Sequence, residues 1–340
     1  MIEASAPGRG GIIGNPSDIY GGTVVSCTIP HRAQAVISSS SKLILDIHGH
    51  YQVVENNEDL AYIPELHFLD VAKAVWRYLR KSEYVASGDI DPQATFMVRA
   101  ESSIPLKAGC AGSTAMLLSV LGGVLAHFEI EISRYEMAEL ARKIERHEME
   151  IHCGYQDQYM VVFGGLNCVD LREKEEHPEG PTAPLATVEP LAGDVGDLPF
   201  ILANTGIQRH SGEFHAAPRT KWEQGDEVQV NGFKRIGELG RLGKKAMVTR
   251  DWEWLGELMN ENYELVEDLI GCGETNTRLI MAARRHGALG AKLSGAGRGG
   301  TVIALHEDPD WLGARLLEEG AERLLRLQPM AGLTVNRIES

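Results

Sequence analysis

The chain has 340 residues, 43% of them hydrophobic and 24% charged, which is typical of a soluble globular protein with one large or two ordinary domains. Its formal net charge of -15 disfavours a nucleic-acid partner, because phosphate-backbone binding needs a clustered basic surface. No apolar run is long enough to span a bilayer, and the first residues lack the pattern of a secretory signal. The five cysteines are widely spaced and include no CxxC pair, so we expect no disulfides or zinc. We therefore expect a cytoplasmic protein with no membrane partner. A homodimer is one assembly that the sequence leaves open.

The first half of the chain mixes strands and helices. Runs of β-branched residues predict strands, and apolar residues at helical spacing predict helices. Strands are expected over residues 23–38, punctuated by Pro30, over the hairpin 43–54 and over 95–100, and helices over 70–81, 113–128 and 134–152. The helix over 113–128 is almost wholly apolar, which predicts that it is buried on most sides.

A charged and then proline-rich stretch follows Asp170, and we place a domain boundary there. The expected domains are residues 1–185 and 186–340. In the second domain, strands are expected over 198–205, 300–306 and 333–338, and helices over 228–249, 252–269 and 308–327. This order of elements predicts an α+β fold.

The glycine-rich loop PLKAGCAGSTA spans residues 105–115, between a predicted strand and a predicted helix. Backbone N–H groups and the helix dipole at such a position favour a phosphate. Gly109 and Gly112 permit close backbone approach, and a structural turn before a core helix is the alternative. The loop lacks the lysine of a Walker A motif. The expected nucleotide-binding residues are Pro105, Lys107, Ala108, Gly109, Cys110, Ala111, Gly112, Ser113 and Thr114.

Two further glycine-rich segments occur at residues 6–20 and 292–301. With the loop at 105–115, and in this order, they resemble the three motifs of the GHMP kinases, the family that includes galactokinase, mevalonate kinase and homoserine kinase. The resemblance implies a two-domain fold, in which an N-terminal βαβ-type nucleotide-binding domain precedes a C-terminal ferredoxin-like αβ sandwich. It also implies ATP and Mg2+ as cofactors. A Rossmann dehydrogenase is disfavoured, because no GxGxxG follows the first strand.

A fourth segment, residues 144–165, resembles a sugar-kinase pattern in which a helix glutamate precedes an aspartate. Here Glu145 and Asp157 are 12 residues apart. By resemblance, Glu145 and Ser113 bind Mg2+ and Asp157 is the catalytic base, roles that suit carboxylate and hydroxyl oxygens. For Glu145 the alternative is a solvated helix face, on which Glu148 and Glu150 are competitors.

In the first segment, Arg9 occupies the position from which relatives of this family direct a cation toward the acceptor oxygen and the γ-phosphate. Asp18 matches the aspartate that holds sugar hydroxyls in galactokinases. Galactokinase-like chains have GEHTD where this chain has GNPSD, so Asn15 removes a negative charge from the sugar subsite. The expected substrate-binding residues are Asn15, Ser17, Asp18, Tyr20, Gly295, Ala296 and Gly297.

The GNPSD motif, the GCAGSTA loop and residues 211–228 together resemble the glucuronokinase subfamily, although GAGRGGT in the third segment follows the general family form. This resemblance implies transfer of the γ-phosphoryl group of ATP to the anomeric hydroxyl of D-glucuronate. Candidate contacts to carboxylate or phosphate are Arg209, His210 and Arg219. Two alternatives stay open. One is a kinase for heptose phosphate, galacturonate or galactose, and the other is a catalytically silent sugar-binding regulator.

Overall fold

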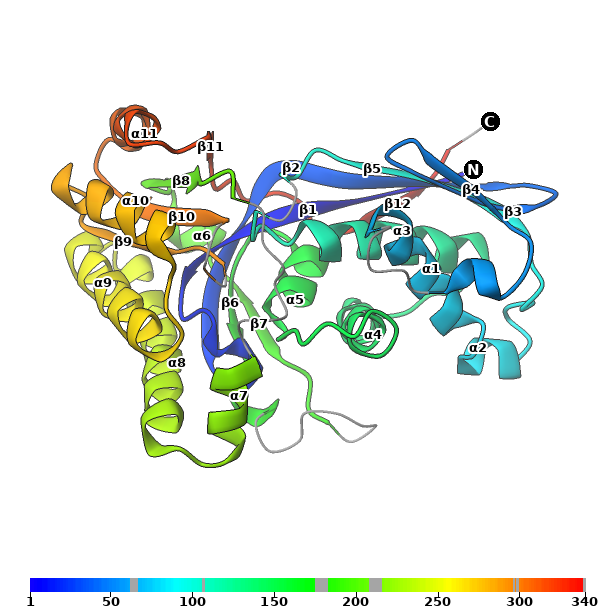
Figure 1. The fold of residues 1–340 in the computed structure, drawn as a ribbon, viewed down its shortest axis with the longest axis horizontal. Coiled ribbons are helices and arrows are strands. Elements are labelled where there is room, and N and C mark those ends of the chain that lie inside the picture. Colours follow the sequence, from blue (N-terminus) through cyan, green and yellow to red (C-terminus); the bar gives the residue numbers. More distant parts are fainter. Residues whose placement is uncertain are drawn as a thin grey trace.

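Two sheets organise the computed structural model, which describes residues 1–61, 67–105, 108–174, 183–207, 216–295, 297 and 300–338. Figure 1 shows the larger sheet extending across the molecule above α1, α3, α4 and α5, with the smaller sheet at the opposite end beside α9, α10 and α11. The helices are α1 (His67–Leu79), α2 (Glu83–Ala86), α3 (Gly112–His127), α4 (Arg134–His147), α5 (Gln156–Phe163), α6 (Ala192–Val195), α7 (Ala216–Glu223), α8 (Glu227–Val248), α9 (Trp252–Leu269), α10 (Glu274–Arg285) and α11 (Pro309–Glu318). Three short 3-10 helices are η1 (Ser17–Tyr20), η2 (Glu58–Leu60) and η3 (Arg172–Lys174).

The larger sheet has eight strands. Its main order is β12 (Thr334–Arg337), β1 (Ile2–Ile13), β2 (Thr23–Ser39), β5 (Phe96–Ser102), β3 (Leu43–Ile47) and β4 (His50–Val54), and β6 (Leu166–Asp170) joins β2 to β7 (Thr187–Pro190). The β3–β5 pairing is parallel, whereas the other pairings are antiparallel. Because β7 and β12 follow residue 185, the first sheet draws strands from both sides of the expected domain boundary.

The smaller sheet has four antiparallel strands, in the order β11 (Arg323–Leu325), β8 (Phe200–Asn204), β10 (Thr301–Leu305) and β9 (Gly290–Leu293). Alternate residues of β8 enter two different cores. Leu202 packs into the core that contains β1 and β2, and Ile201 and Ala203 pack with residues of α10 and α11. The smaller sheet is therefore attached to the larger one through its own side chains.

Strand β2 is one strand of 17 residues, and the interruption expected at Pro30 is absent from it. Its residues 23–27 pair with β6 and its residues 33–39 pair with β5, so Pro30 lies between the two ladders, where its missing N–H removes no pairing. The register of β1 against β2 shifts between Pro7 and Arg9. Such a shift changes the direction of a side chain, here that of Arg9.

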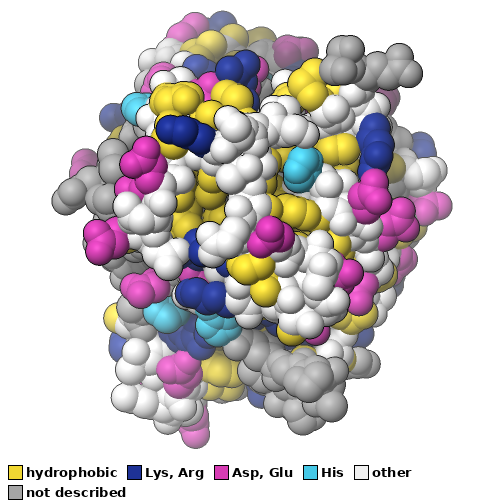
Figure 2. Space-filling model, turned by 90° about the vertical axis from the view of Figure 1, so that its right-hand side faces the viewer, with side chains coloured by type: hydrophobic (Ala, Val, Ile, Leu, Met, Phe, Trp, Pro, Cys, Tyr) yellow, Lys and Arg dark blue, Asp and Glu magenta, His cyan; other side chains and the backbone are white. Residues whose placement is uncertain are grey.

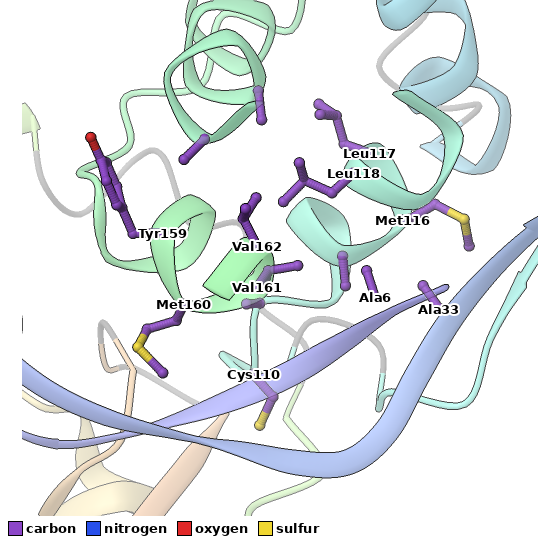
Figure 3. Packing of buried hydrophobic residues seen from close by; sticks show 14 of the residues in the cluster. Ala6, Ala33, Cys110, Met116, Leu117, Leu118, Tyr159, Met160, Val161 and Val162 are labelled. Carbon is purple, nitrogen blue, oxygen red and sulfur yellow. The ribbon is translucent and has the colours of Figure 1, made fainter. Parts of the chain in front are cut away.

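Helix α3 is apolar on nearly every side, as expected, and it packs against β1 and β2. Figure 3 shows Leu117 and Leu118 of α3 facing Val161 and Val162 of α5, with the small side chains of the two strands below. Each fully buried leucine contributes about 1.5–3 kcal/mol. This packing fixes the first turn of α3, and with it the end of the glycine-rich loop.

Two expected helices are shorter in the structure. The helix expected over 134–152 ends at His147, and Glu150 then adopts a positive φ of 55° that turns the chain toward α5. The helix expected over 308–327 ends at Glu318, because Gly320 takes φ 98° and the following residues form β11. Both turns interrupt an amphipathic pattern that continues in the sequence.

Charged side chains of both signs are found at one end of the molecule (Figure 2). Figure 2, which faces the β3–β4 end of the molecule, shows basic side chains interspersed among acidic ones. Within the described part of the chain, no helix has both the length and the apolar character that a membrane span requires.

Candidate active site

Arg9 and Asp157 form an ion pair that joins β1 to the first turn of α5. The Arg9 Nε donates to Asp157 Oδ1 at 2.7 Å, and Nη2 donates to the same oxygen. Its Nη1 donates to the carbonyl of Gly109 at 2.6 Å. Because a guanidinium offers several donors in a fixed plane, one arginine holds the expected base and the glycine-rich loop together.

Asp157 keeps one carboxylate oxygen available. Its side chain is 32% exposed, and Oδ2 has no hydrogen bond to any residue that the structure describes. A general base needs an oxygen within hydrogen-bond reach of the acceptor hydroxyl. The geometry therefore suits a base that is held through Oδ1 and reacts through Oδ2.

Asp18 positions the helix that carries this base. Its Oδ2 accepts the N–H groups of Tyr155 at 2.9 Å and Gln156 at 3.0 Å, at the start of α5. Gly154 permits this approach, because any side chain there would overlap the Asp18 carboxylate. Burial raises the pKa of Asp18, the charge of Asp157 raises it further, and the two backbone donors oppose the rise. A buried Asp18 is thus a support for Asp157 as well as the expected sugar contact.

The glycine-rich loop enters α3 through left-handed residues, with φ 73° at Gly109 and 59° at Ala111. Ala111 is the N-cap residue and offers no side chain to the free N–H groups of the first turn. Arg9 N–H donates to the carbonyl of Cys110 at 3.0 Å, and Thr301 Oγ1 donates to that of Ala108 at 2.8 Å. Strands β1 and β10 therefore hold the loop from two sides, while Lys107 lies outside the described residues.

Glu145 faces α3 and is only 2% exposed, so it does not lie on a solvated helix face. Thr114 Oγ1 donates to its Oε1 at 2.7 Å, and Gln158 Nε2 donates to its Oε2. The Oε1 atom of Gln158 is buried and has no hydrogen bond with the residues described. Ser113, the expected partner of Glu145, is instead exposed at the start of α3.

These groups fit a magnesium ion. Burial raises the pKa of Glu145 to about 7, and the charge of Asp157 adds to that rise. The charge of Asp157 also raises the pKa of Asp18, and of the three carboxylates only Asp157 forms an ion pair with Arg9. A hard cation with oxygen ligands relieves this repulsion. In the described part of the chain, no group of three or more His, Cys, Asp or Glu residues could hold a metal.

The third glycine-rich segment is joined to the first. Gly11 N–H donates to both the Oγ and the carbonyl of Ser294, at 3.0 and 3.2 Å. Asn15 Nδ2 contacts the carbonyls of Leu293 and Gly295 at 3.3 and 3.4 Å. Gly297 is buried, and Ala296 lies outside the described residues. The three segments predicted to form one site therefore do meet.

Two other expected substrate residues, Ser17 and Tyr20, are buried against other parts of the protein. Ser17 Oγ donates to the carbonyl of Gly14 at 2.6 Å, within its own turn. The Tyr20 ring stacks on Phe233 at 3.9 Å, and Trp222 of α7 lies 5.3 Å away. Its buried hydroxyl has no hydrogen-bond partner among the described residues. Burial raises the pKa of Tyr20, whereas the charge of Arg219 lowers it, so Arg219 lies close to this ring.

Several site residues were missed from the sequence. Lys292 is 1% exposed and donates to Asn15 Oδ1 and to its neighbour's carbonyl, each at 2.6 Å. Gln158 and Ser294 hold Glu145 and Arg9 respectively. Lys292 is the first residue of the third glycine-rich segment, and that position was the available signal.

Comparisons with known proteins identify the family. The model of the GHMP kinases N terminal domain matches residues 70–165, and that of the GHMP kinases C terminal matches residues 244–311. The chain belongs to the GHMP kinase family. Members of this family use ATP, and the residues that meet around Arg9 lie in segments from both halves of this GHMP kinase.

Its relatives span nearly the whole chain. Glucuronokinase 1 of Arabidopsis thaliana is 28% identical, with 97% of this chain and 91% of the relative covered. A mevalonate kinase of Pyrococcus horikoshii is 29% identical over 89% of this chain and 88% of its own. The solved structure of Lactococcus lactis galactokinase complexed with galactose superposes with a TM-score of 0.79 at 20% identity, covering 98% and 95% of the two chains. These matches confirm the predicted two-domain GHMP kinase fold.

Proposed function

We propose that this GHMP kinase transfers the γ-phosphoryl group of ATP to the anomeric hydroxyl of a sugar acid, most specifically D-glucuronate. The observation that carries the kinase chemistry is the Arg9–Asp157 pair beside the glycine-rich loop. The acceptor is supported by the GNPSD motif and by the glucuronokinase relative. Residues 1–185 are proposed as the ATP-binding domain and residues 186–340 as the second domain.

In the proposed reaction, Asp157 Oδ2 takes the proton from the C1 hydroxyl of the acceptor. The hydroxyl oxygen forms a bond to the γ-phosphorus, the bond from that phosphorus to the bridging oxygen breaks, and ADP leaves. Arg9 orients Asp157 and places positive charge beside the transferring group. Glu145 and the hydroxyls of Ser113 and Thr114 are the residues for Mg2+, which when bound neutralises charge on the phosphates.

Arginines from two helices support an anionic acceptor. On α4, the Arg142 guanidinium lies 3.7 Å from the centre of the Tyr155 ring, whose backbone N–H contacts Asp18, and Arg146 is one turn further along. On α7, Arg219 is one turn before Trp222. Burial and then the charges of Arg142 and Arg219 lower the pKa of Arg146. These cations gather beside the expected sugar contacts, and a carboxylate there would offset their repulsion.

Arg219 and Arg146 are therefore the proposed contacts to the sugar carboxylate. The other two candidates, Arg209 and His210, lie outside the described residues. Arg219→Gln is expected to raise KM for glucuronate about 10-fold while changing kcat little, because charge-assisted hydrogen bonds contribute about 1.5–3 kcal/mol. Arg315, which pairs with Glu318 on α11 as Arg219 pairs with Glu223, offers a matched control in Arg315→Gln.

The test is an ADP-release assay of the purified protein with MgATP. The acceptors are glucuronate, galacturonate, galactose, a heptose phosphate and mevalonate, the last because mevalonate kinases are among the relatives. Glucuronate is expected to give the highest kcat/KM. Turnover of a neutral sugar, a heptose phosphate or mevalonate without turnover of glucuronate would refute the proposed acceptor. If no acceptor causes ADP release from MgATP, the sugar-binding regulator is favoured instead.

A further inference from the structure

Lys292 is a buried cation that the proposed chemistry does not use. It is the third residue of β9, and its ammonium donates to Asn15 Oδ1 and to the carbonyl of Leu293. Both partners are neutral, and no described residue forms an ion pair with it. Burying an ammonium beside neutral acceptors is costly, so an unneeded charge would not be expected at this position.

The surroundings of Lys292 leave its charge uncompensated. Arg9 on β1 is close enough for its charge to disfavour a second cation, whereas the Cys272 thiol after α9 favours it. Burial keeps that thiol protonated by raising its pKa, with Glu267 adding to the rise. Glu267 itself accepts the Cys272 N–H at 2.6 Å. Among these facing groups, none presents a carboxylate to the ammonium.

Asn15 has no polar atom to spare for a ligand. Its Oδ1 accepts from Lys292, its Nδ2 contacts two carbonyls of the third segment, and the side chain is buried. The effect of Asn15 on the acceptor is therefore one of charge. A glutamate at this position, as in the GEHTD motif, would place a carboxylate against Lys292 and neutralise it.

We infer that Asn15 and Lys292 form a charge-selecting pair, in which the uncompensated ammonium favours an anionic acceptor over a neutral one. This inference rests on the proposed function, because it concerns the same acceptor site. Lys292 is a positioning residue in this scheme, since it acts through its electric field and not by contact with the acceptor.

A pair of variants that differ only in charge provides the test. Asn15→Glu and Asn15→Gln have nearly the same shape, and both are compared with the wild type for kcat/KM on an anionic acceptor and on its neutral counterpart, glucuronate and glucose. We expect Asn15→Glu to lower the anion-to-neutral ratio about 10-fold, the effect of one charge at moderate distance in a partly polar site. Asn15→Gln is expected to change kcat/KM for glucuronate and for glucose by the same factor, so that their ratio stays at the wild-type value. Equal ratios in the two variants would overturn the inference.

The wild-type pH profile gives a second readout that no refolding problem affects. Burial lowers the pKa of Lys292 to about 7, so the ammonium loses its proton as the pH rises through neutrality. The anion-to-neutral ratio should therefore fall several-fold between about pH 6.5 and 8.5 in the wild type. Lys292→Met should have a low ratio that does not change with pH. A constant wild-type ratio would also overturn the inference.

The two proposals fail in different ways. If glucuronate is not a substrate but a heptose phosphate or mevalonate is, the proposed function is wrong, and the ratio is then measured with that anion and its uncharged analogue. If glucuronate is a substrate but the charge-matched variants and the pH profile leave the ratio unchanged, the function stands and the role of Lys292 is wrong.

Discussion

The two halves of the proposed active site, one for the nucleotide and one for the acceptor, are built in different ways. The nucleotide half is a contiguous segment, the loop into α3, supplemented by Glu145. The acceptor half gathers side chains from β1, η1, β9, α4 and α7. Backbone N–H groups at a helix start bind any phosphate, whereas a set of distant charges can be altered one residue at a time. The contrast suggests how one family keeps its reaction and changes its acceptor.

The largest effect is expected where the halves meet. Asp157→Asn keeps the shape of the side chain but removes the base, so kcat should fall about 10²–10⁴-fold for every acceptor. Nucleotide affinity should change little, because Asp157 is neither one of the proposed nucleotide-binding residues nor one of the proposed Mg2+ ligands. Steady-state kinetics and nucleotide titration measure the two quantities, and retained kcat would remove Asp157 from the mechanism.

Arg9→Lys tests whether geometry matters beyond charge. A lysine cannot donate at once to Asp157 Oδ1 and to the Gly109 carbonyl, so kcat should fall about 10²–10³-fold although the charge remains. Arg32→Lys is the control, because Arg32 also bonds several carbonyls but lies away from the site. Equal losses in the two variants would indicate a folding defect, which circular dichroism would detect.

Glu145→Gln tests the nucleotide half alone. The Mg2+ concentration for half-maximal activity should rise about 10–100-fold, by the same factor with every acceptor. Glu148→Gln is the matched control, since Glu148 lies three residues later and pairs with Arg77 at 2.7 Å. If Glu148→Gln alone raised the Mg2+ requirement, the metal ligand would be misassigned.

The smallest effect is one of stability. The pKa of Lys292 in the fold, about 7, is below the ordinary value of 10.5, so the unfolded chain binds more protons between these values. Wild-type stability therefore gains with rising pH across that window, and Lys292→Met lacks this gain. The Tm difference between the two proteins should shift in favour of the wild type by about 2 °C or more from pH 7 to 9. An unchanged difference would mean that Lys292 is not perturbed.

Local signals made the fold, and the place of the glycine-rich loop before α3, predictable. The apolar run of α3 and the glycines before it lie within one segment, where helix spacing and backbone freedom are visible in the sequence. The amphipathic helices α8 and α9 were predicted to within a residue for the same reason. Helix α5 was not predicted, because only eight residues form it and distant Asp18 stabilises its start.

Long-range contacts account for what was missed. Strand β1 contains glycines and a proline that disfavour a strand locally, and its pairing with β2 and β12 overrides them. Lysine is usually a surface residue, and Lys292 is buried only because β9 folds beside Asn15. The proposed role of Lys292 depends on Asn15, which is 277 positions away in the sequence, so no local sequence pattern indicates it.

The pairing of β12 with β1 also orders events during synthesis. Residues 2–5 of β1 pair with residues 334–337, so this edge of the strand stays open until almost the whole described chain has left the ribosome. An open strand edge invites pairing with other chains, and contacts this distant in sequence form slowly. A nascent chain paused before residue 334 would thus leave residues 2–5 of β1 without their partner strand.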